Sequence, residues 1–440
     1  MGNVVYIHSP ALSRAADALP SNLGRAGLVH ELIDALDLLE GDYGPNNTAG
    51  SRRAKVIHPM PATREELLRF HDGRFLDQLL ELEAGSSDDG SSDEPDCSGN
   101  FNLRREDECR PSKRSKVETF GLEDDCPVFD LLPEYVAEVG GASIQAAREL
   151  RDGRASVAIA WTGGRHHGKR GQAAGFCYVQ DIVLAILELR LPPEHPTKPT
   201  LPTIFNEAES PSPPPDLPTK IRRVLYIDLD LHHGDGVEHA LSSTPHVLTL
   251  SAHLHGPGFF PASGSLDSTG PASSPASFHA LNLALEPGLS TPVLLRLFES
   301  CIEPTMEAFR PDAVVVQCGC DGLAGDPCKE WNLDLEGMGE VVRRIIGWKM
   351  KTLLLGGGGY NNANVARCWA YLTSVALGNP LALDTPIPAS VDDYAAFGPS
   401  FSLDVPAGAL REKNTEESVA KVEVAFRQYI ATLESRYKDR

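Results

Sequence analysis

The chain has 440 residues, of which 41% are hydrophobic and 23% charged, so it can bury a sizeable core and is not globally disordered. Its 61 acidic and 40 basic residues give a net charge of −21, which argues against direct DNA binding and suits a basic partner or substrate. No apolar run approaches the ~20 residues of a membrane span, so we expect no transmembrane helix. The first residues show no basic stretch followed by a long apolar one, so we do not expect secretion. Nine cysteines without a paired CxxC fit a reducing compartment.

Two segments differ in composition from the rest. Residues 85–118 are acidic and Ser-rich and then basic, ending in RPSKRSK at 110–116, and residues 192–220 contain ten prolines. Neither segment can fill a core, so we predict that both are disordered insertions, which interrupt a single pattern of alternating strands and helices. The acidic part can steer Lys-rich tails, and the basic run predicts nuclear import, with the cytoplasm as a second location.

Apolar, β-branched runs alternate with helical patterns along the remainder. The predicted strands are 4–8, 156–161, 224–230, 246–251, 313–319 and 352–359. The predicted helices are 28–39, 134–150, 175–189, 337–349, 364–377 and, within a C-terminal tail at 404–440, about 416–437. This alternation predicts an α/β fold over 1–440, a single large domain with a mostly parallel central sheet flanked by helices.

Four of these strands run into polar segments that do not belong in a core. The segments are TGGRHHGKR, LHHGDG, CDGLAGDP and GGGGYNN. Because ligands of parallel sheets bind beyond the carboxyl ends of the strands, we expect these segments to share one site.

A metal half-site is predicted in DLDLHHGDG. Asp228, Asp230 and His232 are each two residues apart. Their side chains therefore point to the same face of the sheet as long as the strand stays extended. Carboxylate and imidazole together suit a divalent metal, and Asp321 after a second strand can supply a third ligand. The alternative is a surface loop rich in turn-forming residues.

Adjacent histidines, His166 and His167, follow another strand between glycines. They can form a second metal pair or an acid/base pair, and the spare carboxylates Asp228 and Asp235 can fix their tautomers. Exposed loop histidines are the ordinary alternative.

The glycine run at 356–360 allows a sharp turn and close approach to a ligand, and it places the phenol of Tyr360 where an oxyanion can be hydrogen-bonded. No GK[ST] follows, which excludes a phosphate-binding loop. Phe176, Phe259 and Phe260 either belong to the core or wall a narrow apolar channel.

Two nucleophile classes are disfavoured. No GxSxG elbow is present, and Cys177 and Cys318 lack a dedicated histidine partner.

These segments together resemble a known family. WTGGRHHGKR, GFCYVQD, YIDLDLHHGDGVE, PGFFPASG, QCGCDGLAGDP and LLLGGGGYNNANVARCW resemble the zinc-dependent class I histone deacetylases of the arginase–deacetylase superfamily, in order from Tyr6 to about Leu403. The resemblance implies hydrolysis of acetyl-lysine to lysine and acetate, with zinc as the cofactor and ferrous iron as the alternative in the cell.

The resemblance also implies residue roles. The metal ligands are Asp230, His232 and Asp321, and the catalytic set is His166, His167, Tyr360, Asp228 and Asp235. The substrate-binding set is Asp125, Gly175, Phe176, Phe260, Cys328, Gly358 and Arg25, with Arg25 at an internal cavity. A structural K⁺ or Na⁺ falls at Asp228, Asp230, His232, Ser251 and Ala252.

Departures from the family pattern bear on partners. Asn22, Pro327 and Ala363 stand where corepressor-bound members have inositol-phosphate-binding basic residues, and Cys328 stands where Leu or Met is usual. The chain therefore resembles the branch that acts without inositol-phosphate-bridged corepressors.

Three functions remain open at this point. The leading one is a protein lysine deacetylase acting on acetylated histones or other chromosomal proteins, and so on chromatin and transcription. The others are an acetylpolyamine amidohydrolase and a non-catalytic acetyl-lysine-binding scaffold.

Overall fold

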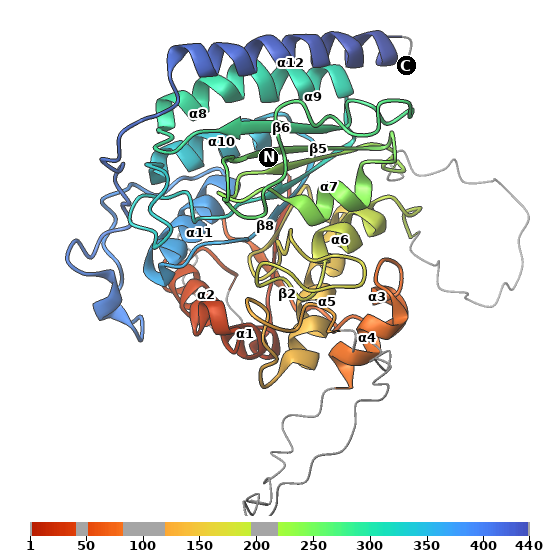
Figure 1. Ribbon diagram of the computed structural model, residues 1–440. Coiled ribbons are helices and arrows are strands. Elements are labelled where there is room, and N and C mark those ends of the chain that lie inside the picture. The colour runs from red at the N-terminus through yellow and green to blue at the C-terminus, as the bar shows by residue number, and fades with distance from the viewer. Residues whose placement is uncertain (1, 41–51, 82–118, 195–218, 439–440) are drawn as a thin grey trace, which may run out of the picture.

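An eight-stranded, all-parallel sheet forms the centre of the computed structural model, which describes residues 2–40, 52–81, 119–194 and 219–438. Its order is β2-β1-β3-β8-β7-β4-β5-β6 (Figure 1). The strands are β1 Val4–Ile7, β2 Lys55–Ile57, β3 Val157–Ala160, β4 Val224–Asp228, β5 Val247–Leu254, β6 Ala280–Leu285, β7 Ala313–Gln317 and β8 Lys351–Leu355. Most residues of these strands are buried, because helices cover both faces of the sheet.

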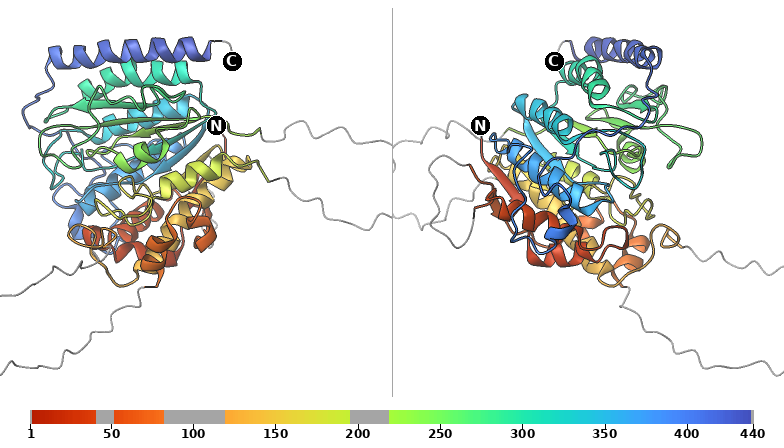
Figure 2. Two further views of the ribbon diagram at one scale, coloured as in Figure 1. Left: turned by 45° about the vertical axis from the view of Figure 1, so that its right-hand side comes forward. Right: turned by 90° about the vertical axis from the view of Figure 1, so that its left-hand side faces the viewer.

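Helices form a layer on each face of the sheet, as the views in Figures 1 and 2 show. One core contains α1 Pro10–Asp17, α3 Arg64–Leu67, α4 Gly73–Leu80, α5 Leu132–Arg151, α6 Asp181–Leu189 and α7 Asp235–Leu241. The other contains α2 Arg25–Ala35, α8 Thr291–Leu297, α9 Glu303–Phe309, α10 Leu335–Gly347, α11 Asn362–Ala376 and α12 Glu416–Tyr437. Short elements are η1 Pro20–Asn22, the π-helix η2 Phe298–Ile302 and η3 Tyr394–Phe397. The predicted α/β fold with a single large domain is confirmed.

Several predicted boundaries were wrong for local backbone reasons. The helix expected at 175–189 begins only at Asp181, because Gly175 and Phe176 take φ values of 54° and 63° that a helix cannot contain. The helix expected at 28–39 ends at Ala35, before Asp37 at φ 60°. Strands β2 and β6 were not predicted.

The insertion predicted at 85–118 lies outside the described residues, as does most of the one at 192–220. The ends that are described lie after α6 and before β4, at the amino edge of the sheet. No helix in the described ranges is both long and apolar enough to cross a membrane.

Candidate active site

The four polar segments meet at the carboxyl edge of the sheet, as expected. In the sheet register Asp228 pairs with both Ser251 and Gln317, Gln317 pairs with Leu355, and Leu355 pairs with Ala160. The last residues of β3, β4, β7 and β8 therefore form one row, and the loops that follow these strands leave it together.

The structure brings Asp230, His232 and Asp321 together. His232 Nδ1 lies 2.9 Å from Asp321 Oδ2 and 3.4 Å from Asp230 Oδ1. Strand β4 ends at Asp228, so alternation along an extended strand does not align these residues. A bend does so instead, in which the backbone N–H of His232 donates to Asp230 Oδ1 at 3.1 Å.

Two buried carboxylates and an imidazole fit a divalent cation. Burial and the neighbouring Asp230 raise the pKa of Asp321, so the two carboxylates repel each other. Against the effect of burial, His166 and His232 hold the pKa of Asp230 well below its usual range. A divalent cation would relieve this repulsion, and Asp, His and Asp are ligands that zinc accepts. The thiol of Cys328 lies near two of these donors, because the donor atoms of His232, Asp321 and Cys328 all lie within 4.8 Å of one another.

Neighbouring groups fix the Asp230 carboxylate. Its Oδ2 accepts hydrogen bonds from Gln317 Nε2 at 2.7 Å and from the backbone N–H of Gly358 at 2.8 Å. Gly358 allows this approach, since a Cβ there would lie 2.5 Å from Asp321 Oδ2.

The two histidines each use Nδ1 to hold a carboxylate. His166 Nδ1 lies 2.9 Å from Asp228 Oδ2, and His167 Nδ1 lies 2.8 Å from Asp235 Oδ1. Each therefore has only Nε2 left for the site, which favours an acid/base pair over a second metal pair.

Their electrostatic environments differ. Burial lowers the pKa of His166, but Asp228 and Asp230 outweigh it and raise that pKa to about 9. Burial and His166 lower the pKa of His167 to about 3, despite Asp235. The surrounding carboxylates thus favour the charged form of His166, whereas burial favours the neutral form of His167, which can accept a proton.

Tyr360 stands beside the carboxylates with its phenol protonated. Burial, Asp321 and Asp230 raise its pKa well above the usual value, so the hydroxyl acts as a hydrogen-bond donor. Its backbone N–H donates to Asp326 Oδ2 at 2.7 Å, which positions the residue after the glycine turn.

Aromatic rings surround these polar groups. The Phe176 ring lies 5.8 Å from that of Tyr360, and the Phe260 ring lies 4.9 Å from that of His167. Phe259 stacks on His232 with centroids 5.1 Å apart. Gly175 leaves room between them, because a Cβ there would lie 2.4 Å from His167 Cδ2. These contacts suit a narrow apolar channel.

Comparison with known proteins identifies the family. The model of the histone deacetylase domain matches residues 20–196 and 217–376. Histone deacetylase 8 of Danio rerio is 36% identical over 420 residues, covering 96% of this chain and 93% of that protein. Histone deacetylase 8 of Xenopus tropicalis is 33% identical, covering 95% of each chain. Histone deacetylase 2 of Oryza sativa subsp. japonica is 36% identical, covering 95% of this chain and 70% of that protein.

The chain belongs to the histone deacetylase family. The prediction of a class I-like deacetylase of the arginase–deacetylase superfamily is thereby confirmed, whereas the roles of individual residues stay predictions.

The predicted rim and cation residues of this histone deacetylase lie near the site. Asp125 Oδ2 accepts a hydrogen bond from the backbone N–H of Gly175 at 2.7 Å. Ser251 lies opposite Asp228 in the sheet, with Ala252 next to it, and its hydroxyl contacts His253 Nδ1 at 2.9 Å. The monovalent cation stays a prediction.

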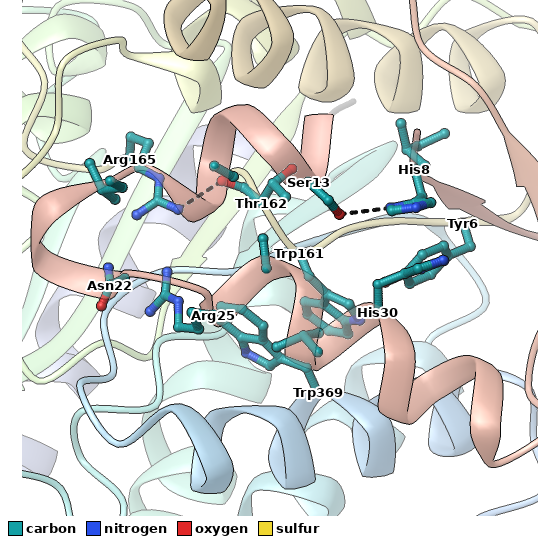
Figure 3. A pocket seen from close by; sticks show the side chains of 15 residues that line it. Tyr6, His8, Ser13, Asn22, Arg25, His30, Trp161, Thr162, Arg165 and Trp369 are labelled. Carbon is teal, nitrogen blue, oxygen red and sulfur yellow. Dashed lines mark hydrogen bonds between the residues drawn. The ribbon is translucent and has the colours of Figure 1, made fainter. Parts of the chain in front are cut away.

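Arg25 lies beneath the glycine turn rather than in the channel. Its guanidinium donates to the carbonyls of Gly359 at 2.8 Å and Gly357 at 3.1 Å, and it lies 5.0 Å from the Trp369 ring. Figure 3 shows it lining a small cavity that Arg165 also lines.

Sequence reasoning missed three supporting residues of this histone deacetylase. Gln317 positions Asp230, and the Tyr226 hydroxyl donates to Asp228 Oδ2 at 2.6 Å. The position of Tyr226 two residues before Asp228 is a usable signal. Arg165 is buried, and its Nη2 donates to the carbonyl of Thr162 at 2.8 Å. Nothing in TGGRHHGKR distinguishes it from an exposed loop arginine.

Proposed function

We propose that this histone deacetylase hydrolyses N6-acetyl-lysine in histone tails or other chromosomal proteins to lysine and acetate, as a metal-dependent enzyme acting in the nucleus on chromatin and transcription. One observation carries the proposal: a carboxylate-held histidine, a phenol and three metal-donor side chains meet at one site walled by aromatic rings.

Asp230, His232 and Asp321 would hold the metal. When bound, a divalent cation polarises a carbonyl and lowers the pKa of water. Zinc fits these donors, and ferrous iron is the cellular alternative.

The residues of the chain then have separate roles in proton transfer and in charge stabilisation. His167 Nε2 takes a proton from the attacking water and returns it to the lysine nitrogen as the amide bond breaks, while Asp235 fixes its tautomer. His166, whose charged form Asp228 favours, would stabilise negative charge nearby. The Tyr360 hydroxyl donates to the oxygen that develops charge in the transition state.

The aromatic walls of the channel and Asp125 at its rim would bind the substrate. Phe176 and Phe260 would enclose the aliphatic stem of the acetyl-lysine, and the carboxylate of Asp125 would accept a backbone N–H of the substrate. The net charge of −21 favours approach of Lys-rich tails.

The test combines metal analysis with turnover on an acetyl-lysine peptide and on acetylspermidine. Asp321→Asn should lose metal and activity together. His167→Ala should keep the metal and lose activity by about 10²–10⁴-fold. The control His239→Ala removes an exposed histidine of α7 and should match the wild type. Loss of metal from His167→Ala would refute its role as a base, and faster turnover of acetylspermidine would favour a polyamine substrate.

A further inference from the structure

Cys328 places a soft donor beside the proposed metal site. Its sulfur lies within 4.8 Å of the donor atoms of both His232 and Asp321. The residue is half-buried, and it follows β7 in the segment that leads from Asp321 towards α10. The predicted substrate-binding position, where Leu or Met is usual, gives the thiol no role of its own.

The loop around Cys328 is tied to the site. Asp326 Oδ1 accepts a hydrogen bond from the backbone N–H of Cys328 at 2.9 Å, and its Oδ2 accepts one from the N–H of Tyr360 at 2.7 Å. The same carboxylate therefore fixes the backbone of Cys328 and of Tyr360. The Cys328 thiol also hydrogen-bonds the Asp326 side chain, a contact that metal binding would replace.

The remaining displacement is small. Donor atoms around tetrahedral zinc lie about 3.3–3.7 Å apart, because metal–ligand bonds are ~2.0–2.3 Å long. The 4.8 Å limit of the group exceeds this spacing by about 1 Å, so a small movement of the sulfur would be enough for ligation.

Other thiols near the site are placed differently. Cys318 and Cys320 are buried, with their sulfurs 4.0 Å and 3.6 Å from the carbonyls of Val316 and Cys318. Among the described residues, only Cys328 joins two of the proposed ligands in a three-donor group.

We propose that Cys328 Sγ is a displaceable fourth ligand of this metal, an inference that rests on the metal proposed above. A metal–sulfur bond forms, one water leaves, and the thiol proton passes to solvent. A substrate carbonyl reverses the exchange, with the thiol protonated again. The thiolate thus competes with substrate and favours zinc over ferrous iron, because soft sulfur prefers zinc.

The experiment uses the full chain loaded with Co²⁺, with cobalt content measured. The wild type should show a near-ultraviolet sulfur-to-cobalt charge-transfer band, which Cys328→Ser and Cys328→Leu should lose. Cys320→Ser, which removes the neighbouring thiol outside the donor group, should keep it. Saturating acetohydroxamic acid, which binds metals as a carbonyl analogue, should abolish the wild-type band.

Zinc-loaded protein gives a second readout. X-ray absorption should show a Zn–S distance of ~2.3 Å in the wild type and only nitrogen and oxygen at ~2.0–2.1 Å in Cys328→Ser. We expect the zinc affinity of that variant to fall by about 10-fold.

Three results would overturn the inference. A fully loaded wild type without the band excludes sulfur ligation, and a band retained by Cys328→Ser assigns it to another thiol. A band that survives acetohydroxamic acid makes the sulfur a permanent ligand. Deacetylase turnover in a metal-loaded wild type that lacks the band would refute this inference alone, whereas failure of the wild type to bind any metal would refute the proposed function as well.

Discussion

His8 should make folding of this deacetylase sensitive to acid. It follows β1 and stacks on His30 of α2 with ring centroids 3.2 Å apart and planes at 12°. Both residues line the cavity of Figure 3. His8 is only 8% exposed, and its carbonyl is 2.8 Å from His58 Nδ1. A proton on His8 would therefore enter a site that already holds two other imidazoles.

The magnitude follows from the pKa of His8. Burial, His30 and His58 lower it from 6.5 to about 3, and the Ser13 hydroxyl lies 3.5 Å from His8 Nδ1. The unfolded chain takes up this proton first, so the contribution to stability is complete above about pH 6.5 and is lost as the pH falls towards 3. Each pH unit costs about 1.4 kcal/mol, which amounts to about 3 kcal/mol by about pH 4.5.

The assay is urea unfolding of the wild type and His8→Phe at about pH 7 and pH 4.5. Phe keeps a ring against His30 but cannot titrate. The free energy of unfolding of the variant, relative to the wild type, should rise by about 3 kcal/mol at the lower pH. Ser13→Ala, which removes only the neighbouring hydroxyl, should change the free energy of unfolding by the same amount at about pH 7 and at about pH 4.5. An equal difference between wild type and His8→Phe at the two pH values would refute the reasoning.

Three further outcomes concern activity. Tyr360→Phe should lower kcat by about 10²–10³-fold with little change in KM, because the hydroxyl acts on the transition state; a raised KM with unchanged kcat would contradict this. Gly175→Ala should lose turnover by pushing on His167, whereas Gly24→Ala, also at positive φ but with nothing within 4 Å, should keep it; equal losses in both would show that backbone strain alone is responsible. Inositol hexakisphosphate should leave activity of the purified protein unchanged, since Asn22, Pro327 and Ala363 carry no charge, and a clear stimulation would exclude this view of its partners.

The carboxyl-edge site was predictable because its signals are local. Apolar runs that end in Gly, Asp and His mark strand ends, and parallel topology brings those ends together. Strand β6 was not predictable, because Asn282 interrupts its apolar run and is buried only through hydrogen bonds to Glu238 and the carbonyl of Ser268. Burial of Arg165 likewise depends on tertiary placement. The position of Cys328 beside the donors depends on how Asp326 fixes its loop, which spacing in the sequence does not reveal.

The strand order also sets when the site can exist during synthesis. Strands β1–β3 form one edge block of the sheet and β4–β6 the other, and the last two strands to be made, β7 and β8, lie between the blocks. β3 ends at residue 160 but its inner neighbour β8 begins only at residue 351, so the halves stay unjoined over a long stretch of translation. His166 and His167 follow the first block and His232 belongs to the second. A nascent chain that stops short of β8 therefore carries two sheet fragments with exposed inner edges, which are targets for chaperones, and no assembled catalytic centre.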